Sequence, residues 1–101
     1  MDIENFGQYL AEKREEKNFT IADVEAEIKI RGSYLKAIEE ENYNQLPQRV
    51  YTVGFVRRYS SFLQLNNDEI EAVVQHFKDA MTKKEGGGSA AVPPMQGIET
   101  R

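Results

Sequence analysis

The sequence predicts an all-α protein of five helices. Three observations support this fold class. Apolar residues recur at helical spacing in five segments, helix-start signals stand at Thr20 and Asn66, and no segment alternates apolar and polar residues as a strand would. A chain of 101 residues forms one domain at most. We expect this domain to span residues 1–85, followed by a disordered linker rich in Gly, Pro and Ser over residues 86–101.

The first helix is predicted over residues 3–17. Phe6 and Leu10 lie four residues apart and mark its inner face. Asn18 stands where a left-handed residue commonly ends a helix, and asparagine tolerates that conformation better than most residues.

Two short helices joined by a tight turn are predicted next, over residues 21–29 and 32–41. Thr20 precedes the first of them as an N-cap, and Asp23 occupies the capping-box position three residues later. Ile30 anchors the turn in the core. This arrangement is a helix-turn-helix.

The fourth helix is predicted over residues 47–65, with Pro47 in its first turn, where a missing N–H costs nothing. The segment contains no acidic residue, although the chain carries a net charge of −4. Its apolar and aromatic arc is roughly 200° wide, against ~100° for an ordinary surface helix. Either this helix lies centrally in the domain or its aromatic flank is left for a partner. The aromatic residues are Tyr51, Phe55, Tyr59 and Phe62, and the basic residues are Arg49, Arg57 and Arg58.

The fifth helix is predicted to run to about Lys83. Asn66 is its N-cap candidate, and Glu69 follows in the capping-box position. Its apolar residues recur at helical spacing as far as Met81. We expect His76, which has no metal ligand or nucleophile patterned around it, to be a surface residue.

Charge and composition exclude several classes of function. Residues 1–46 contain six Lys/Arg and eleven Asp/Glu, a net charge of −5, which is unfavourable for neutralising phosphates. The chain has no cysteine, no signal peptide and no apolar run near the ~18 residues of a membrane span. We therefore expect a soluble, cytoplasmic, non-enzymatic domain without a metal or cofactor.

Two segments resemble a known family. TIADVEAEIKIRGSYLKAIEE, residues 20–40, resembles the helix-turn-helix of the Xre and lambda-repressor class. The continuation LPxxVYxxGFxRxY, residues 46–59, is more specific and is similar to the RodZ family of bacterial cell-shape proteins. The similarity extends over about residues 6–77. One departure is Gly32, where the family usually has a proline that starts the third helix, and glycine leaves that start looser.

The resemblance implies an architecture and a partner. Members of the RodZ family have a cytoplasmic five-helix domain, a linker, one membrane span and an extracytoplasmic region, so the resemblance implies a span beyond residue 101. The cytoplasmic domain of the family binds the bacterial actin MreB through its fourth helix, linking the filament to the membrane and to cell-wall synthesis. The aromatic contact pair of the family falls on Tyr51 and Phe55. We expect this fragment to be monomeric.

The candidate partner-binding residues lie on the fourth helix. They are Tyr51, Phe55, Gly54, Arg57 and Arg58, with the two arginines forming a basic rim that steers toward an acidic partner. The alternatives are core packing for the two aromatic residues and a solvated face for the arginines. Tyr59 and Phe62 are assigned to the core.

The alternative function is a sequence-specific DNA-binding transcription regulator that reads bases through its third helix. Its candidate contacts are Arg31, Ser33, Tyr34 and Lys36, with Gly32 and Ala37 also expected on the exposed face. The run of residues 39–41, all glutamate, is expected to lie on a solvated face and to repel the duplex. The sequence therefore favours a protein partner over DNA.

Overall fold

The structure, a computed structural model, describes residues 5–84 and contains five α-helices and no strand within that range. The helices are α1 (Phe6–Glu16), α2 (Ile21–Ile28), α3 (Gly32–Glu40), α4 (Arg49–Phe62) and α5 (Asn67–Lys84), with a short 3-10 turn, η1 (Tyr43–Gln45), before α4. The predicted all-α fold class is confirmed. The linker predicted over residues 86–101 lies outside the described residues.

Two helices begin later than the sequence predicts. Asn5 is extended, so α1 begins at Phe6 and not at residue 3. Pro47 lies before α4, because the first carbonyl in the helical hydrogen-bond ladder belongs to Gln48. The carbonyl oxygen of Pro47 instead accepts a hydrogen bond of 2.9 Å from the hydroxyl of Thr52.

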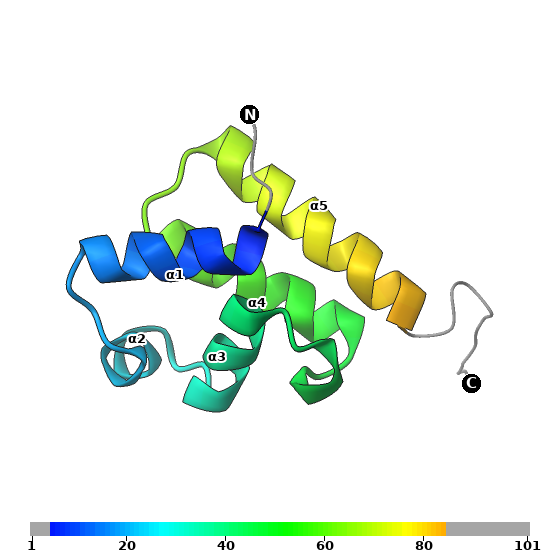
Figure 1. Cartoon of the computed structure of the whole chain (residues 1–101), viewed down its shortest axis with the longest axis horizontal. Helices are drawn as coiled ribbons and strands as arrows, with labels where there is room; N and C mark the ends of the chain where they lie inside the picture. Colours follow the sequence, from blue (N-terminus) through cyan, green and yellow to red (C-terminus); the bar gives the residue numbers. More distant parts are fainter. Residues whose placement is uncertain (1–4, 85–101) are drawn as a thin grey trace.

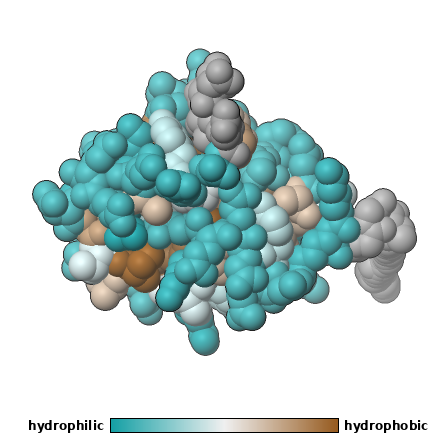
Figure 2. All heavy atoms as spheres, in the orientation of Figure 1, coloured by the Kyte–Doolittle hydropathy of each residue, from teal (hydrophilic) through white to brown (hydrophobic). Residues whose placement is uncertain are grey.

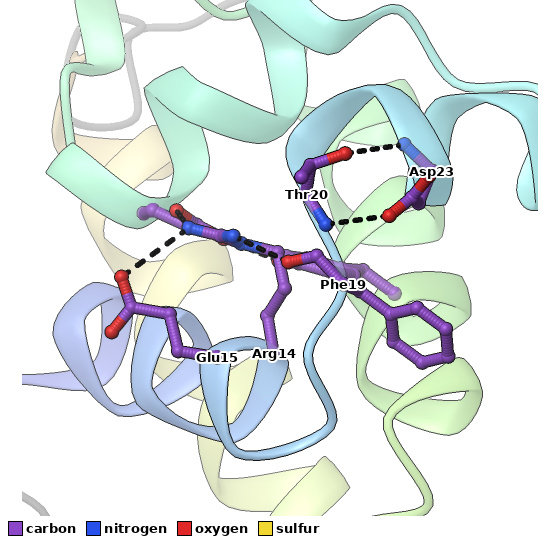
Figure 3. A network of polar contacts seen from close by, with 7 residues as sticks. Arg14, Glu15, Phe19, Thr20 and Asp23 are labelled. Carbon is purple, nitrogen blue, oxygen red and sulfur yellow. Dashed lines mark hydrogen bonds and ion pairs between the residues drawn. The ribbon is translucent and has the colours of Figure 1, made fainter.

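The helix-start signals at Thr20 and Asn66 form as predicted. The hydroxyl of Thr20 accepts from the backbone N–H of Asp23 at 3.1 Å, and the Asp23 carboxylate accepts from the backbone N–H of Thr20 at 2.9 Å (Figure 3). Asn66 and Glu69 exchange the same two hydrogen bonds, at 2.8 and 3.0 Å. Both α2 and α5 therefore start at reciprocal capping boxes.

The helices pack into two connected groups (Figure 1). α1 and α2 both pack against α3, and α4 lies along α5. α2 also contacts α4, which joins the helix-turn-helix to the second pair. Figure 2 shows one face of the molecule as mostly hydrophilic, with a hydrophobic area on the side where α2 and α3 lie.

The core receives side chains from all five helices, and α4 is central to it. Val56, Tyr59 and Leu63, on or just after α4, are 0–1% exposed. The helix is thus covered over much of its wide apolar arc, which explains part of that width. The other large side chains that are fully buried are Leu10, Val24, Leu35, Ile38, Val73, Phe77 and Met81.

Gly7 brings α1 into backbone contact with α3. A Cβ atom at this buried position would lie 2.6 Å from the carbonyl oxygen of Ile38 and closer still to that of Glu39. Real Cβ atoms do not approach backbone that closely, so any side chain would push the two helices apart.

We predict that Gly7→Ala lowers the free energy of unfolding by about 1–3 kcal/mol, the usual cost of overpacking a core. Gly54→Ala in α4 is the matched control, because a Cβ there meets nothing within 4 Å. The control should raise the free energy of unfolding by about 0.5–1 kcal/mol. Denaturant unfolding of both variants measures the difference, and equal effects would contradict the proposed contact between α1 and α3.

Candidate functional site

The outward face of α4 exposes apolar side chains that the domain does not cover. Val50 and Tyr51 are 71% and 57% exposed, and they are the exposed large hydrophobic residues of the described chain. Sequence reasoning singled out Tyr51 but not Val50. Val50 could have been identified from its position four residues before Gly54, because residues at that spacing lie on the same side of a helix.

Phe55 lies beside Tyr51 but is half-buried. Its ring stacks on Tyr34 of α3, with the ring centroids 5.7 Å apart and the planes 23° from parallel. Phe62 is also half-buried and packs against Phe19 at 5.2 Å. Two rings of the aromatic flank thus pair with rings from α3 and from the segment before α2, while Tyr51 remains largely open to solvent.

The arginines of α4 differ in what they contact. Arg57 forms an ion pair with Glu71 of α5 at 2.7 Å, and hydrogen bonding to that carboxylate raises the pKa of Arg57. Arg49 donates to the hydroxyl of Thr82 at 2.9 Å. Arg58 is exposed and makes no ion pair or side-chain hydrogen bond within residues 5–84. Arg58 therefore adds an uncompensated charge to the outward face of α4.

The candidate DNA-contact residues differ in their exposure to solvent. Arg31, Ser33 and Lys36 are exposed, whereas Tyr34 is half-buried in its stack with Phe55. Ala37, which we expected on the exposed face, is 3% exposed, because it lies on the side of α3 that faces the core.

The glutamates that follow these residues are not all on a solvated face, so that expectation is wrong for two of them. The Glu39 side chain is only 9% exposed and accepts from Arg14 Nε at 2.8 Å and Nη2 at 3.2 Å. Tyr59 also donates its hydroxyl hydrogen to Glu39. Burial and this hydrogen bond raise the pKa of Tyr59, which stays neutral.

Arg14 extends this network to the segment between α1 and α2. Its Nη1 donates to the carbonyl oxygen of Phe19 at 2.7 Å, and its Nη2 lies 3.8 Å from the Glu15 carboxylate (Figure 3). Arg14 thus fixes the corner that precedes the capping box of α2. Its own pKa is raised, chiefly by the hydrogen bonds to Glu39.

Glu41 is a second, half-buried acceptor, and its contacts correct the expectation for His76. One carboxylate oxygen accepts from the backbone N–H of Gly7 at 3.0 Å. The other lies 2.5 Å from the Tyr43 hydroxyl and 2.7 Å from His76 Nε2, which must carry the proton because an ionised carboxylate only accepts. His76 also stacks on Phe6 at 4.3 Å, so it is a half-buried structural residue and not a surface one.

The comparisons with known proteins bear on this arrangement. A model of a helix-turn-helix domain family matches residues 9–70, which is more than half of the chain. The chain belongs to this helix-turn-helix family. Helix-turn-helix domains of this kind are typically not enzymes.

One relative adds information about context. The chain is similar to the uncharacterized membrane protein YmfM of Bacillus subtilis strain 168, with 33% identity over 60 residues. The alignment covers 59% of this chain but only 20% of that protein. No solved structure matches. Among residues 5–84, no helix combines the length and the apolar character that a membrane crossing requires.

We predict that acidification destabilises the domain through Glu41. Burial raises the pKa of this carboxyl, but hydrogen bonds from Tyr43, Gly7 and His76 outweigh burial and lower it below its usual value of 4.5. A depressed folded-state pKa adds stability above the unfolded pKa, and that stability is lost as the pH falls through the folded value. Below about pH 4.5 the free energy of unfolding should therefore decrease.

The Glu41→Gln variant should lose stability near neutral pH and show a flatter dependence at acidic pH. Glu71→Gln is the matched control, because Glu71 and its partner Arg57 are 63% and 51% exposed and such pairs contribute little. Chemical unfolding between pH 3 and pH 7 compares them. Parallel curves for Glu41→Gln and wild type would contradict this role.

Proposed function

We propose that this helix-turn-helix domain is the protein-interaction head of a membrane-anchored cell-shape protein, and that it binds the bacterial actin MreB through α4 on the cytoplasmic side of the membrane. The RodZ-like segment over residues 46–59 supports the partner, and similarity to a protein described as a membrane protein supports the anchor. In this role the domain links the filament to the membrane and to cell-wall synthesis.

The observation that carries the proposal is the exposed face of α4. Val50 and Tyr51 expose apolar surface beside Gly54, and Arg58 adds a charge that nothing within residues 5–84 compensates. Aromatic and arginine side chains are the types that dominate binding energy at protein interfaces. The domain gains no packing from leaving these groups exposed, so a partner is the simplest account of them.

Reading of DNA through α3 is the less favoured function. Arg31 and Lys36 are the exposed cations on or next to this helix, whereas base readout also requires surrounding phosphate contacts. The net charge of −5 over residues 1–46 opposes the approach of a duplex.

Tyr51→Ala and Phe55→Ala test the proposal as a matched pair. Tyr51→Ala should weaken binding to MreB filaments by about 2 kcal/mol or more, roughly 30-fold, with the melting temperature nearly unchanged, because the ring is mostly exposed. Phe55→Ala should weaken binding and also lower the melting temperature, because it removes the stack on Tyr34. Co-sedimentation and thermal unfolding measure the two effects. Full binding by a folded Tyr51→Ala variant would refute the proposed interface.

For DNA we predict only weak, non-specific binding at ~150 mM salt. Fluorescence anisotropy with random and defined duplexes measures it, and sub-micromolar affinity for one sequence would favour the regulator instead. Arg31→Ala and Lys36→Ala should then remove that affinity, while Arg58→Ala should not.

A further inference from the structure

Three residues of α4 form one row along its outward face. Val50, Gly54 and Arg58 follow each other at intervals of four residues, so they lie on neighbouring turns of the same side, and Tyr51 lies next to the row. All four are exposed. The row therefore presents an apolar end, a gap and a cationic end.

The absence of a side chain at Gly54 does not serve packing within the described domain. A Cβ at this position would meet nothing within 4 Å, and the backbone there is regular helix. Glycine inside an exposed helix destabilises folding relative to alanine. Glycine at position 54 instead affects a binding partner, because the missing side chain lets the partner's backbone come closer to α4.

The charges on α4 limit which kind of molecule can bind its outward face. No residue of α4 is acidic, Arg57 already pairs with Glu71, and Arg58 has no ionic partner within residues 5–84. Two copies of this chain packed through the same face would bring like charges together, since a two-fold interface pairs identical patches. The occupant must instead supply an acid.

We propose, as an extension that rests on the proposed function, that the partner element is an acidic α-helix that crosses α4 over Gly54. Its apolar side chains pack on Val50 and Tyr51, and one of its carboxylates pairs with Arg58. A helix fits because the distance between crossing helices depends on side-chain size at the contact, and Gly54 minimises it. A strand would need an open sheet edge, which the backbone of α4 does not offer. Val50 thereby becomes a contact residue in its own right.

Gly54→Ala gives the sharpest test, because the proposal predicts opposite signs for folding and binding. The melting temperature should rise by roughly 2–8 °C, since alanine favours the helix and meets no neighbour. Binding to MreB filaments should weaken by at least about fivefold, the lower end of the cost of overpacking a close contact. A glycine that matters only for folding would not move the two quantities in opposite directions.

Two further variants test the ends of the row against matched controls. Val50→Ala should weaken filament binding, whereas Val53→Ala, on the half-buried side of α4, should chiefly lower the melting temperature. Arg58→Glu should slow association and reduce its dependence on salt, because it reverses the uncompensated charge. Arg57→Glu should have the smaller effect on binding, since Glu71 already neutralises Arg57.

The outcomes separate this inference from the function on which it rests. If wild type does not bind filaments, the proposed function fails and the inference with it. If wild type binds but Gly54→Ala and Val50→Ala bind equally well, the inference alone is overturned. If sedimentation velocity shows a wild-type dimer that Gly54→Ala dissociates, the occupant is a second copy and the acidic helix is excluded.

Discussion

The carboxylate of Glu39 is the interaction on which the arrangement of the helices depends. It lies at the end of α3 and accepts hydrogen bonds from Arg14 of α1 and Tyr59 of α4, so one side chain joins three helices. Removing either donor would leave a poorly solvated charge without a full set of partners, which is far more costly than losing an exposed pair. The same α3 terminus supplies Glu41, which contacts α1, η1 and α5.

This bonding has a consequence for the outer face of α4. Tyr59 is fully buried and held by Glu39, and Phe55 rests on Tyr34, so the inner side of the helix is fixed at two points. The opposite side is then presented in one orientation. A docking surface on a helix held in this way loses little conformational entropy on binding, which favours affinity without a larger contact area.

The sequence alone predicted the features that depend on residues within one helical turn of each other. Both capping boxes join residues three apart, and the left-handed Asn18 ends α1 as predicted, with φ 63°. The contacts of Glu39 and Glu41 with Arg14, Tyr59 and His76 span 20–35 residues, so no local pattern distinguishes these glutamates from a solvated acidic run.

The candidate site was partly predictable for a similar reason. The wide apolar arc of α4 left two possibilities open, a central helix or an aromatic flank free for a partner, and it did not show which side chains would be covered. That choice depends on where Tyr34 and Phe19 lie, and their positions follow from the packing of α2 and α3. Tyr51 was therefore recognisable as a candidate, whereas the exposure of Val50 and the engagement of Arg57 were not.

Four turns of the domain contain a strained backbone residue at which its stability could be increased. Lys29, Glu41 and Gln64, like Asn18, adopt left-handed backbone conformations, with φ from 53° to 67°, and none of them is glycine. Each such corner carries strain of the order of 1 kcal/mol that glycine would relieve. At Glu41 the strain is retained because the side chain bonds three groups of the domain, but Lys29 contributes only its backbone to that corner. Replacing Lys29 with glycine would relieve the strain at that corner and stabilise the domain, while the exposed surface of α4 would stay unchanged.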